Sequence, residues 1–473
     1  MITSEFSNRS YSTRLRTALV LTGTGTAGAY HAGVLRALHE AGVRVDVIAG
    51  RGVGAVGAVF GAVDGAQRLW DEHGLWKGAA ATRAYRWRRP LQIAGWTAVV
   101  AVALLCVPLV LFGLGIVAAM VGFLLGMVGS TRLSGSFTTV YGRWIDWLFS
   151  PPVLPTVLPR LVLACVVILV ATLAAGVVVS WLRAPARRRI RRGALGWLLG
   201  APLSAAGLMD LCANDLWKLI RGAAPVAAPA AATLGRHYLE LLIENLGQPG
   251  FRELLLIAHD MDARRDVVFA ALAGTYRQRF FSRPDATGRL QAEIFDLAGV
   301  GREHAIDALT ASLRVPVATE PHLVTFAAEG VWRGETHRLC DRPGAILRLL
   351  DELAAAGVEQ VIVPSAAPPP AGPHELSSGR GDLRGRAGEL LATTETAALR
   401  DLSEQFGARF AAVHVIRPAH NPLGPLDFDG VYDEHSDRRY TLAELVDRGY
   451  EDAYRQFIEP VVAGSSESVA SRQ

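Results

Sequence analysis

The sequence predicts an α/β domain with a mainly parallel sheet, interrupted by an insertion of two transmembrane helices. Strand and helix patterns alternate on both sides of the insertion. Two apolar runs are long enough to cross a bilayer. Of the 473 residues, 51% are hydrophobic, which is too many for an average soluble domain and too few for a bundle made only of membrane helices.

The N-terminal region repeats a strand, turn and helix unit twice. Residues 17–22 form an apolar run typical of a buried strand, and a Gly-rich turn joins them to a helical pattern over residues 30–41. A second strand is predicted at 45–49, and the turn 50–54 leads into a helix of small residues that ends near Ala62. This order predicts parallel strands joined by helices.

The same alternation resumes after the insertion. Helices are predicted at 236–244, 305–313, 345–356, 386–406 and 442–457, strands at 253–258, 323–326, 360–364 and 411–416, and a loop at 365–385. We therefore expect one α/β domain built from residues 15–90 and 183–463, an insertion at 91–182, and disordered tails at 1–14 and 464–473.

The first apolar run, residues 92–129, is longer than one membrane span. Its 38 residues would form a helix of about 57 Å, against a hydrocarbon core of about 30 Å. We expect either a long helix, tilted or kinked at Pro108, that projects beyond the bilayer, or a hairpin that turns near Gly113 and Gly115. The second run, 161–182, spans once. A buried hairpin inside a soluble domain is the alternative, but runs of this length are rare in soluble cores.

Arginine clusters at 83–89 and 183–192 flank the insertion, whereas the loop 130–160 between the runs carries few charges and many aromatic residues. Under the positive-inside rule both clusters are cytoplasmic, so an even number of spans lies between them. We expect an integral protein of the inner (cytoplasmic) membrane, with membrane lipids as its partners and the α/β domain in the cytoplasm.

The remaining composition excludes several classes of function. The net charge is +4, and removing the ten clustered arginines leaves 4 − 10 = −6, so no nucleic-acid partner is expected. The four cysteines lack metal-ligand or redox spacing, and no cofactor is expected. His259, Asp260 and Asp262 follow a strand end and could bind a metal, but capping of the next segment is the simpler interpretation.

The first Gly-rich turn has the pattern G-x-G-x-x-G and allows two interpretations. Its residues are Gly23, Thr24, Gly25, Thr26, Ala27 and Gly28. In a dinucleotide site it would hold a pyrophosphate, with an acidic residue at the end of the second strand, but Asp46 stands at the start of that strand. The other interpretation is an oxyanion hole, in which backbone N–H groups converge on developing negative charge.

The second turn has the spacing of a nucleophile elbow, G-x-S-x-G, without the serine. Its residues are Gly50, Arg51, Gly52, Val53 and Gly54, and the sequence contains no G-x-S-x-G elsewhere.

The segment ALVLTGTGTAGAYHAGVLRALHEAGVRVDVIAGRGVGAVGAVFGA, with its two closely spaced glycine turns, resembles the opening block of the patatin-like phospholipases. The segments ALTASLRVPVATEP, VEQVIVPS and PLDFDGVYDE resemble later parts of the family more loosely, the last those of bacterial members. The resemblance covers about 15–62 well and 195–460 loosely, and it implies a three-layer α/β/α fold and an acyl-lipid substrate.

Family members hydrolyse acyl esters with a serine nucleophile and an aspartate in a D-G-[GA] turn. The resemblance maps the oxyanion loop onto Gly23, Gly25 and Gly28, with Ala27 where a basic residue is usual, and the nucleophile onto Gly52. The acidic turn maps near 328–331, which makes Glu329 the acidic candidate.

We therefore expect a pseudoenzyme that binds acyl lipid, because glycine supplies no nucleophile for an acyl-enzyme. If only the nucleophile has been lost, Gly52→Ser should restore hydrolysis. The alternatives are a working acyl hydrolase that uses Thr24, Thr26 or Cys340, and a scaffold that serves protein contacts only.

Overall fold

The computed structural model describes residues 11–129, 131–183, 200–283, 292–367, 369, 372, 381, 383–406, 409–418, 422–433 and 438–463. The chain divides into two compact units. One unit, an α/β domain, combines Met1–Arg86 with Leu203–Gln473, and the other is Trp87–Pro202. The expected tails fall largely outside the described residues.

The N-terminal elements of the α/β domain follow the predicted order. Strand β1 (Thr17–Leu21) leads to α1 (Ala27–Glu40), and β2 (Val47–Gly50) leads to α2 (Gly54–Ala62). Every residue of α2 is buried, because this helix contains only glycine, alanine, valine and phenylalanine and packs on all sides. Helix α1 begins three residues before the predicted start, inside the glycine turn.

The remaining elements of this unit are numerous. The helices are α3 (Gln67–Trp70), η1 (Ala81–Arg83), α7 (Ala206–Arg221), α8 (Ala231–Asn245), α9 (Gly274–Phe281), η2 (Val300–His304), α11 (Ala305–Ser312), α12 (Ala345–Ala355), α13 (Leu383–Phe406), α14 (Leu442–Ala453) and η3 (Tyr454–Ile458). The strands are β3 (Arg86–Trp87), β4 (Leu203–Ser204), β5 (Glu253–Asp260), β6 (Arg265–Ala271), β7 (Ile294–Asp296), β8 (His322–Thr325), β9 (Thr336–Cys340), β10 (Gln360–Pro364), β11 (Ala412–Ile416), β12 (Pro422–Leu423), β13 (Val431–Asp433) and β14 (Arg438–Tyr440).

The central sheet has the order β11-β10-β1-β2-β5-β6-β7, and β9 joins it beside β5 with β8 paired to β9. The five strands from β11 to β5 are mutually parallel, as predicted. Strand β6 is antiparallel to β5 and was not predicted. The turn between them places Arg264 at a φ of +56°, a conformation for which glycine or asparagine is the usual sequence signal.

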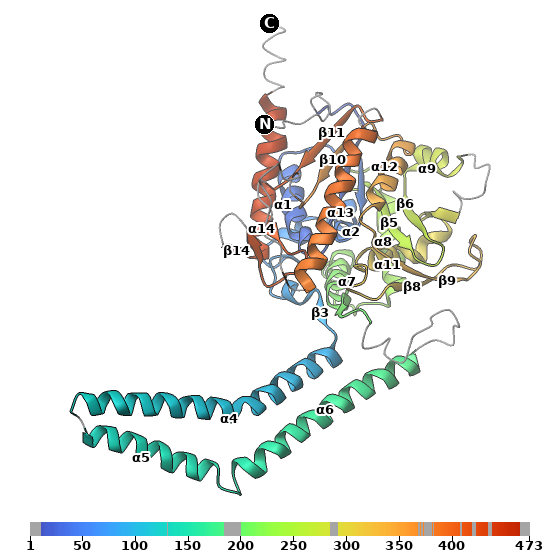
Figure 1. Cartoon of the computed structure of the whole chain (residues 1–473). Coiled ribbons are helices and arrows are strands. Elements are labelled where there is room, and N and C mark those ends of the chain that lie inside the picture. The colour runs from blue at the N-terminus through green and yellow to red at the C-terminus, as the bar shows by residue number, and fades with distance from the viewer. Residues whose placement is uncertain are drawn as a thin grey trace. The chain divides into compact units, whose positions relative to one another are not determined.

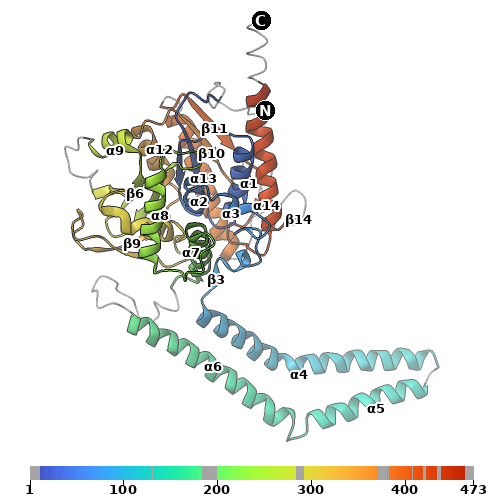
Figure 2. The ribbon, with the colours of Figure 1, turned by 180° about the vertical axis from the view of Figure 1, so that it is seen from behind.

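Successive residues of the central strands point to opposite faces of the sheet and enter two separate cores. Leu19, Leu21 and Ile48 belong to the core under α1, α2, α7, α8, α11 and α14. Ala18, Val20 and Val47 belong to the core under α9, α12 and α13. Helix α13 stands in front of the sheet in Figure 1 and α8 in front of it in Figure 2, seen from behind. The fold is therefore the expected α/β/α arrangement.

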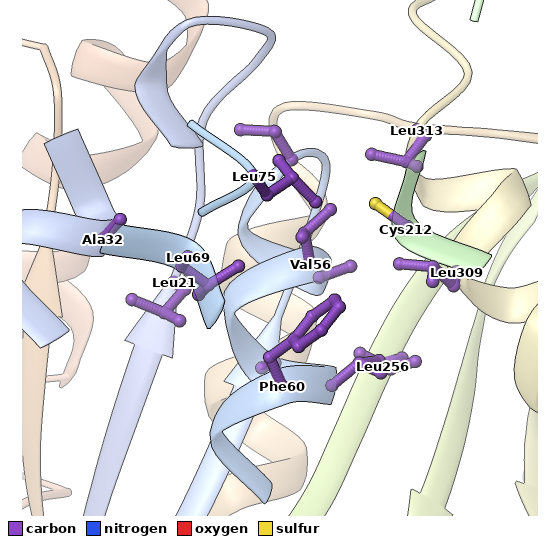
Figure 3. Close-up of a cluster of buried hydrophobic side chains, with 14 of the residues drawn as sticks. Leu21, Ala32, Val56, Phe60, Leu69, Leu75, Cys212, Leu256, Leu309 and Leu313 are labelled. Carbon is purple, nitrogen blue, oxygen red and sulfur yellow. The ribbon is translucent and has the colours of Figure 1, made fainter. Parts of the chain in front are cut away.

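Figure 3 shows part of the first core, where buried side chains of α1, α2, α3, α7 and α11 meet those of β1 and β5. Phe60 and Val56 of α2 lie between Leu21 of β1 and Leu256 of β5, and Cys212 of α7 closes one side. Burying a large aliphatic or aromatic side chain contributes about 1.5–3 kcal/mol, so this core supplies much of the stability that holds the glycine turns in place.

The second unit consists of α4 (Arg89–Met127), α5 (Thr131–Leu148) and α6 (Leu154–Arg183). The run 92–129 forms one continuous helix up to Met127 with Pro108 inside it, and no hairpin turn occurs at Gly113 or Gly115. Helices α4 and α6 are long and apolar enough to cross a membrane, and they are scarcely buried, which argues against the soluble-core hairpin. The expected loop between them contains α5.

Candidate functional site: two glycine turns and a buried ion cluster

The first glycine turn connects β1 to α1 and is held by close backbone contacts. Gly23 and Gly25 have positive φ angles of +88° and +59°. A Cβ atom at Gly25 would lie 1.9 Å from the carbonyl oxygen of Pro425, and one at Gly28 would lie 2.1 Å from the ring of Trp76. These glycines are required because other parts of the chain approach the backbone where a side chain would stand.

The second turn connects β2 to α2 and packs directly on the first. Gly52 has a φ of +58°, and a Cβ atom there would lie 2.1 Å from the carbonyl oxygen of Gly23. A Cβ atom at Gly54 would lie 2.2 Å from the carbonyl oxygen of Leu21. The position that an elbow nucleophile would occupy is therefore filled by backbone.

Two backbone N–H groups of the turns that could face a substrate oxygen have partners within the chain. Val53 N–H, next to the nucleophile position, donates to the carbonyl oxygen of Gly23 at 3.0 Å. Thr26 N–H donates to the carbonyl oxygen of Pro425 at 2.8 Å. An oxyanion hole needs such donors to point at the substrate oxygen. Here the N–H groups of Val53 and Thr26 bind the chain's own carbonyl groups.

Arg51, beside Gly52 in the elbow, lies at the centre of a buried ion cluster. Its Nη1 is 2.8 and 2.7 Å from the two carboxylate oxygens of Asp341, and its Nη2 is 3.1 Å from Oε2 of Glu395. Oε1 of Glu395 accepts a hydrogen bond of 2.7 Å from the Thr22 hydroxyl. Arg51 itself is fully buried. A buried guanidinium requires this pairing, because an isolated charge in the protein interior is strongly unfavourable.

The pKa values in the cluster follow from burial and charge. Burial opposes the Arg51 cation, but the two carboxylates outweigh it and the pKa of Arg51 is raised. Burial raises the pKa of Asp341 although Arg51 works in the opposite direction. Both carboxylate oxygens of Asp341 are nevertheless bound to Arg51, and this pairing leaves them less available to accept a proton from another group.

His31 on α1 is a buried histidine whose two ring nitrogens have no hydrogen-bond partner. Burial and then the nearby Arg51 charge lower its pKa to about 3, so the ring is neutral at physiological pH. Its Cε1 atom lies 3.3 Å from the point where a Cβ atom of Gly23 would stand, and Oε2 of Glu395 lies 3.9 Å from the same point. His31 therefore packs against both the glycine turn and the ion cluster.

A cavity of about 140 Å³ lies beside the first turn. Its wall is made mostly of small residues from the turn, α13 and the segment around Pro425, which are Gly23, Thr24, Thr26, Ala27, Ala366, Ala367, Gly385, Gly388, Ala392, Gly424 and Pro425. Tyr30, Leu391, Val431 and Leu445 add apolar surface, and Glu389, Thr393 and Glu395 add polar groups. The volume is close to the roughly 150 Å³ of an apolar cavity that accepts benzene, so it suits a segment of an alkyl chain.

The structure brings together the two glycine turns that the sequence predicts to form the site, but it places Glu329 away from them. The two turns lie against each other, as their spacing predicts. Glu329 is exposed in the turn between β8 and β9, whereas Asp341 lies at the elbow, with Oδ2 at 3.0 Å from a Cβ position on Gly52. Asp341 is therefore the carboxylate at the nucleophile position, and Glu329 is not.

Asp341 was missed because the residues after it are Arg342 and Pro343, not the glycines of a D-G-[GA] turn. The available signal was its place directly after the alternating segment that forms β9. Among the other nucleophile candidates, Thr24 and Thr26 line the cavity. Cys340 is buried, and burial raises the pKa of its thiol to about 12, which keeps it protonated and weakly nucleophilic.

The polar residues after β5 cap a turn. Oδ1 of Asp260 accepts hydrogen bonds from the backbone N–H groups of Asp262 and Ala263, each at 2.9 Å. Oδ2 of Asp260 lies 2.5 Å from Nδ1 of His337, and Asp262 pairs with Arg338. No group of metal-ligating side chains occurs within the described ranges. The geometry of Asp260 agrees with the capping interpretation.

The family comparison agrees with this architecture. The family model described as patatin-like phospholipase matches residues 19–341. The search of curated proteins found no match. Among solved structures, the chain is similar to VipD from Legionella pneumophila, with 10% identity, a TM-score of 0.30, and coverage of 96% of this chain and 68% of VipD. Because the family match covers more than half of the 473 residues, the chain belongs to the patatin-like phospholipase family.

Proposed function

We propose that the α/β domain binds an acyl chain of a membrane lipid in the cavity beside the first glycine turn and does not hydrolyse its ester. In this proposal the family's lipid specificity is retained and its chemistry is lost. The helices α4 and α6 anchor the domain to the membrane from which the lipid comes.

The observation that carries the proposal is the close packing of the first glycine turn on Gly52 of the second. Position 52 has neither a side chain nor room for one, since the Gly23 carbonyl oxygen occupies the space. The same carbonyl oxygen accepts a hydrogen bond from the N–H of Val53, a donor that could otherwise stabilise an oxyanion. An acyl-enzyme mechanism needs both a nucleophile and these donors, and losing the nucleophile alone removes nearly all of the nucleophilic rate.

The cavity supports the binding half of the proposal. It is lined mostly by apolar atoms, and the carboxylate of Glu395, which is buried, is already paired with Arg51 and Thr22. Such a site favours an alkyl chain over a charged ligand, because an alkyl segment gains about 0.8 kcal/mol per buried CH₂.

The membrane half rests on the two apolar helices. Both meet the length and composition of a membrane span, and most of their large apolar side chains are exposed in the structure. Exposed apolar surface of this extent requires lipid or protein cover. The side of the membrane that the domain faces follows only from the arginine clusters, of which residues 184–192 lie outside the described residues.

The test uses the full chain in lipid nanodiscs, with two measurements and two matched variants. The measurements are binding of a fluorescent long-chain fatty acid and release of fatty acid from phospholipid. Ala392→Phe places a ring in the cavity, and Thr394→Phe places the same ring on an exposed position of the same helix. We expect no fatty-acid release by the wild type, and at least tenfold weaker binding for Ala392→Phe but not for Thr394→Phe.

Fatty-acid release above the empty-nanodisc background would show a working hydrolase and direct attention to Thr24 and Thr26, the hydroxyl groups that line the cavity. Equal binding by both variants would place the acyl chain elsewhere. No binding and no release by the wild type would favour a scaffold for protein contacts.

A further inference from the structure

The second half of α4 and helix α5 form an antiparallel pair within the helical unit. The hydroxyl group of Tyr141 on α5 donates to the carbonyl oxygen of Leu111 on α4 at 2.6 Å. Gly115, one turn further along α4, makes room for it, because a Cβ atom there would lie 2.8 Å from that hydroxyl. The contact fixes α5 along the part of α4 that follows Pro108.

The length of α4 divides naturally at Pro108. Residues 89–108 are 20 residues, or about 30 Å of helix, which matches the hydrocarbon thickness of a bilayer. Proline removes a helical hydrogen bond and permits a bend, and α4 is bent near its middle in both views (Figures 1 and 2). The first half of α4 is thus long enough to cross the membrane alone.

The second half of α4 is also strongly apolar, and most of its large side chains are exposed although α5 covers one side. Its exposed side chains include Phe112 at 70%, Phe123 at 69% and Met127 at 73% exposure. A helix with this surface does not stand free in water. This half also exceeds the length of helix that one crossing of the bilayer needs.

Helix α5 carries the surface expected at such a boundary. Val140, Trp144 and Trp147 are exposed and follow one another at helical spacing, which gives an outward apolar stripe. Thr139, Arg143 and Asp146 form an adjacent exposed polar stripe with the same spacing. An amphipathic helix with tryptophan beside its polar stripe is typical of the lipid headgroup layer.

We propose that α5 and residues 109–127 form an interfacial helical pair in the headgroup layer of the membrane face opposite to the face at which α4 enters and α6 leaves. Val140, Trp144 and Trp147 face the acyl chains, and Thr139, Arg143 and Asp146 face water. This proposal rests on the membrane anchoring in the proposed function. It adds a second membrane contact, which lies in the far leaflet and does not span the bilayer.

Two other arrangements fit the observations less well. As a third span, α5 would place Arg143 and Asp146 within the hydrocarbon core, and with three spans the two arginine clusters would lie on opposite sides. As an arm in water, the pair would expose the aromatic and aliphatic side chains of both helices.

The experiment measures the depth of spin labels on α5 in the full chain reconstituted in phospholipid vesicles. Cys106, Cys165, Cys212 and Cys340 are first replaced by alanine, and flotation with vesicles shows whether this background is anchored. Single cysteines are then introduced at the two stripes, as Val140→Cys, Trp144→Cys and Trp147→Cys, and as Thr139→Cys, Arg143→Cys and Asp146→Cys. Collisions with oxygen report lipid, and collisions with a water-soluble nickel chelate report water.

We expect oxygen to dominate for the first stripe and the nickel chelate for the second, so that accessibility varies along α5 with a period of about 3.6 residues. Labels at Phe112 and Phe123 should lie at similar shallow depths. Nickel accessibility at all six α5 positions, or a label at Trp144 near the bilayer centre, would overturn the interfacial pair while flotation still supports anchoring. Failure to float would overturn both the pair and the anchoring.

Discussion

At the scale of single residues, the site is determined by Gly52 and Arg51, two neighbours in one turn. Gly52 allows the second turn to touch the first, and Arg51 fills the space beneath them with a charge that Asp341 and Glu395 balance. The acidic residue at the nucleophile position is therefore present, but it serves the structure of the turn.

Gly52→Ser should not restore hydrolysis, contrary to what the sequence alone suggests. The new Cβ atom would overlap the Gly23 carbonyl oxygen, and the positive φ adds strain, so we expect a loss of about 3 kcal/mol in the free energy of unfolding. Gly42→Ser is the control, because Gly42 has a φ of +63° with nothing within 4 Å. Chemical denaturation compares the free energies of unfolding of the two variants. A gain of fatty-acid release by Gly52→Ser would show that the turn can accept a side chain at position 52.

Arg51→Met should be strongly destabilising, by about 3–5 kcal/mol, because it leaves Asp341 and Glu395 buried without their cation. Arg36→Met removes an exposed pair with Glu40 and should change stability by less than about 1 kcal/mol. Urea denaturation followed by tryptophan fluorescence compares the two. Equal losses would mean that the buried cluster contributes no more than a surface pair.

His31 predicts a specific dependence of stability on pH. Its pKa in the folded state is about 3, below the ordinary 6.5, so the unfolded chain binds the extra proton between these values. Stability therefore falls as the pH decreases from 6.5 towards 3, by up to about 1.4 kcal/mol per pH unit. His31→Phe should reduce the change in unfolding midpoint between pH 6.5 and 3. The control variant His73→Phe, at an exposed position, should not change it. An unchanged profile for His31→Phe would show that His31 does not titrate in this range.

At the scale of elements, α1 is held between the first turn and α14. A Cβ atom at Gly33 would lie 1.8 Å from the carbonyl oxygen of Val446, and one at Gly449 would lie 2.1 Å from that of Tyr30. The two helices thus pack backbone against backbone. Helix α14 starts with a capping box between Thr441 and Glu444, which fixes its first turn near this contact.

Gly33→Ala should destabilise the domain by about 2–3 kcal/mol, although alanine is intrinsically the better helix former by about 1 kcal/mol. The overlap with backbone decides the sign, because the backbone cannot rotate away. Gly274→Ala in α9, where no atom lies within 4 Å, should be neutral or slightly stabilising. Thermal unfolding of both variants measures this, and a stabilised Gly33→Ala would show that the helices can separate at no cost.

At the scale of the whole molecule, the helical unit and the α/β domain differ in the apolar surface that they expose. The large exposed apolar side chains are concentrated between Trp87 and Val178. The N–H of Arg88 donates to the carbonyl of Pro202 at 3.1 Å, so the chain enters and leaves the helical unit at neighbouring points.

Replacing residues 89–201 with a short Gly/Ser linker should therefore give an α/β domain that stays monodisperse without detergent and unfolds cooperatively. The physical reason is that both sheet cores are formed by residues outside the replaced segment. Size-exclusion chromatography and circular dichroism check this. Aggregation in the absence of detergent would mean that the helical unit covers part of the domain.

The features of this protein that depend on local patterns could be predicted from the sequence. The βαβ order, the glycine turns and the apolar runs each have a period or a composition that a short window reveals, and the family resemblance follows from the turns. Helix α5 is amphipathic as well, but its few charges and many aromatic residues suggested a loop at the membrane surface.

The contacts of the site, in contrast, come from distant parts of the chain and could not be predicted from local patterns. Arg51 meets Asp341 and Glu395 across 290 and 344 residues of chain, and the carbonyl oxygen of Pro425 closes the first turn from the C-terminal region. A backbone carbonyl leaves no mark in the sequence, and an aspartate without its usual glycine neighbours gives no motif. Folding brings these groups together through the packing of distant elements, and it places the Gly23 carbonyl oxygen where a side chain at position 52 would stand.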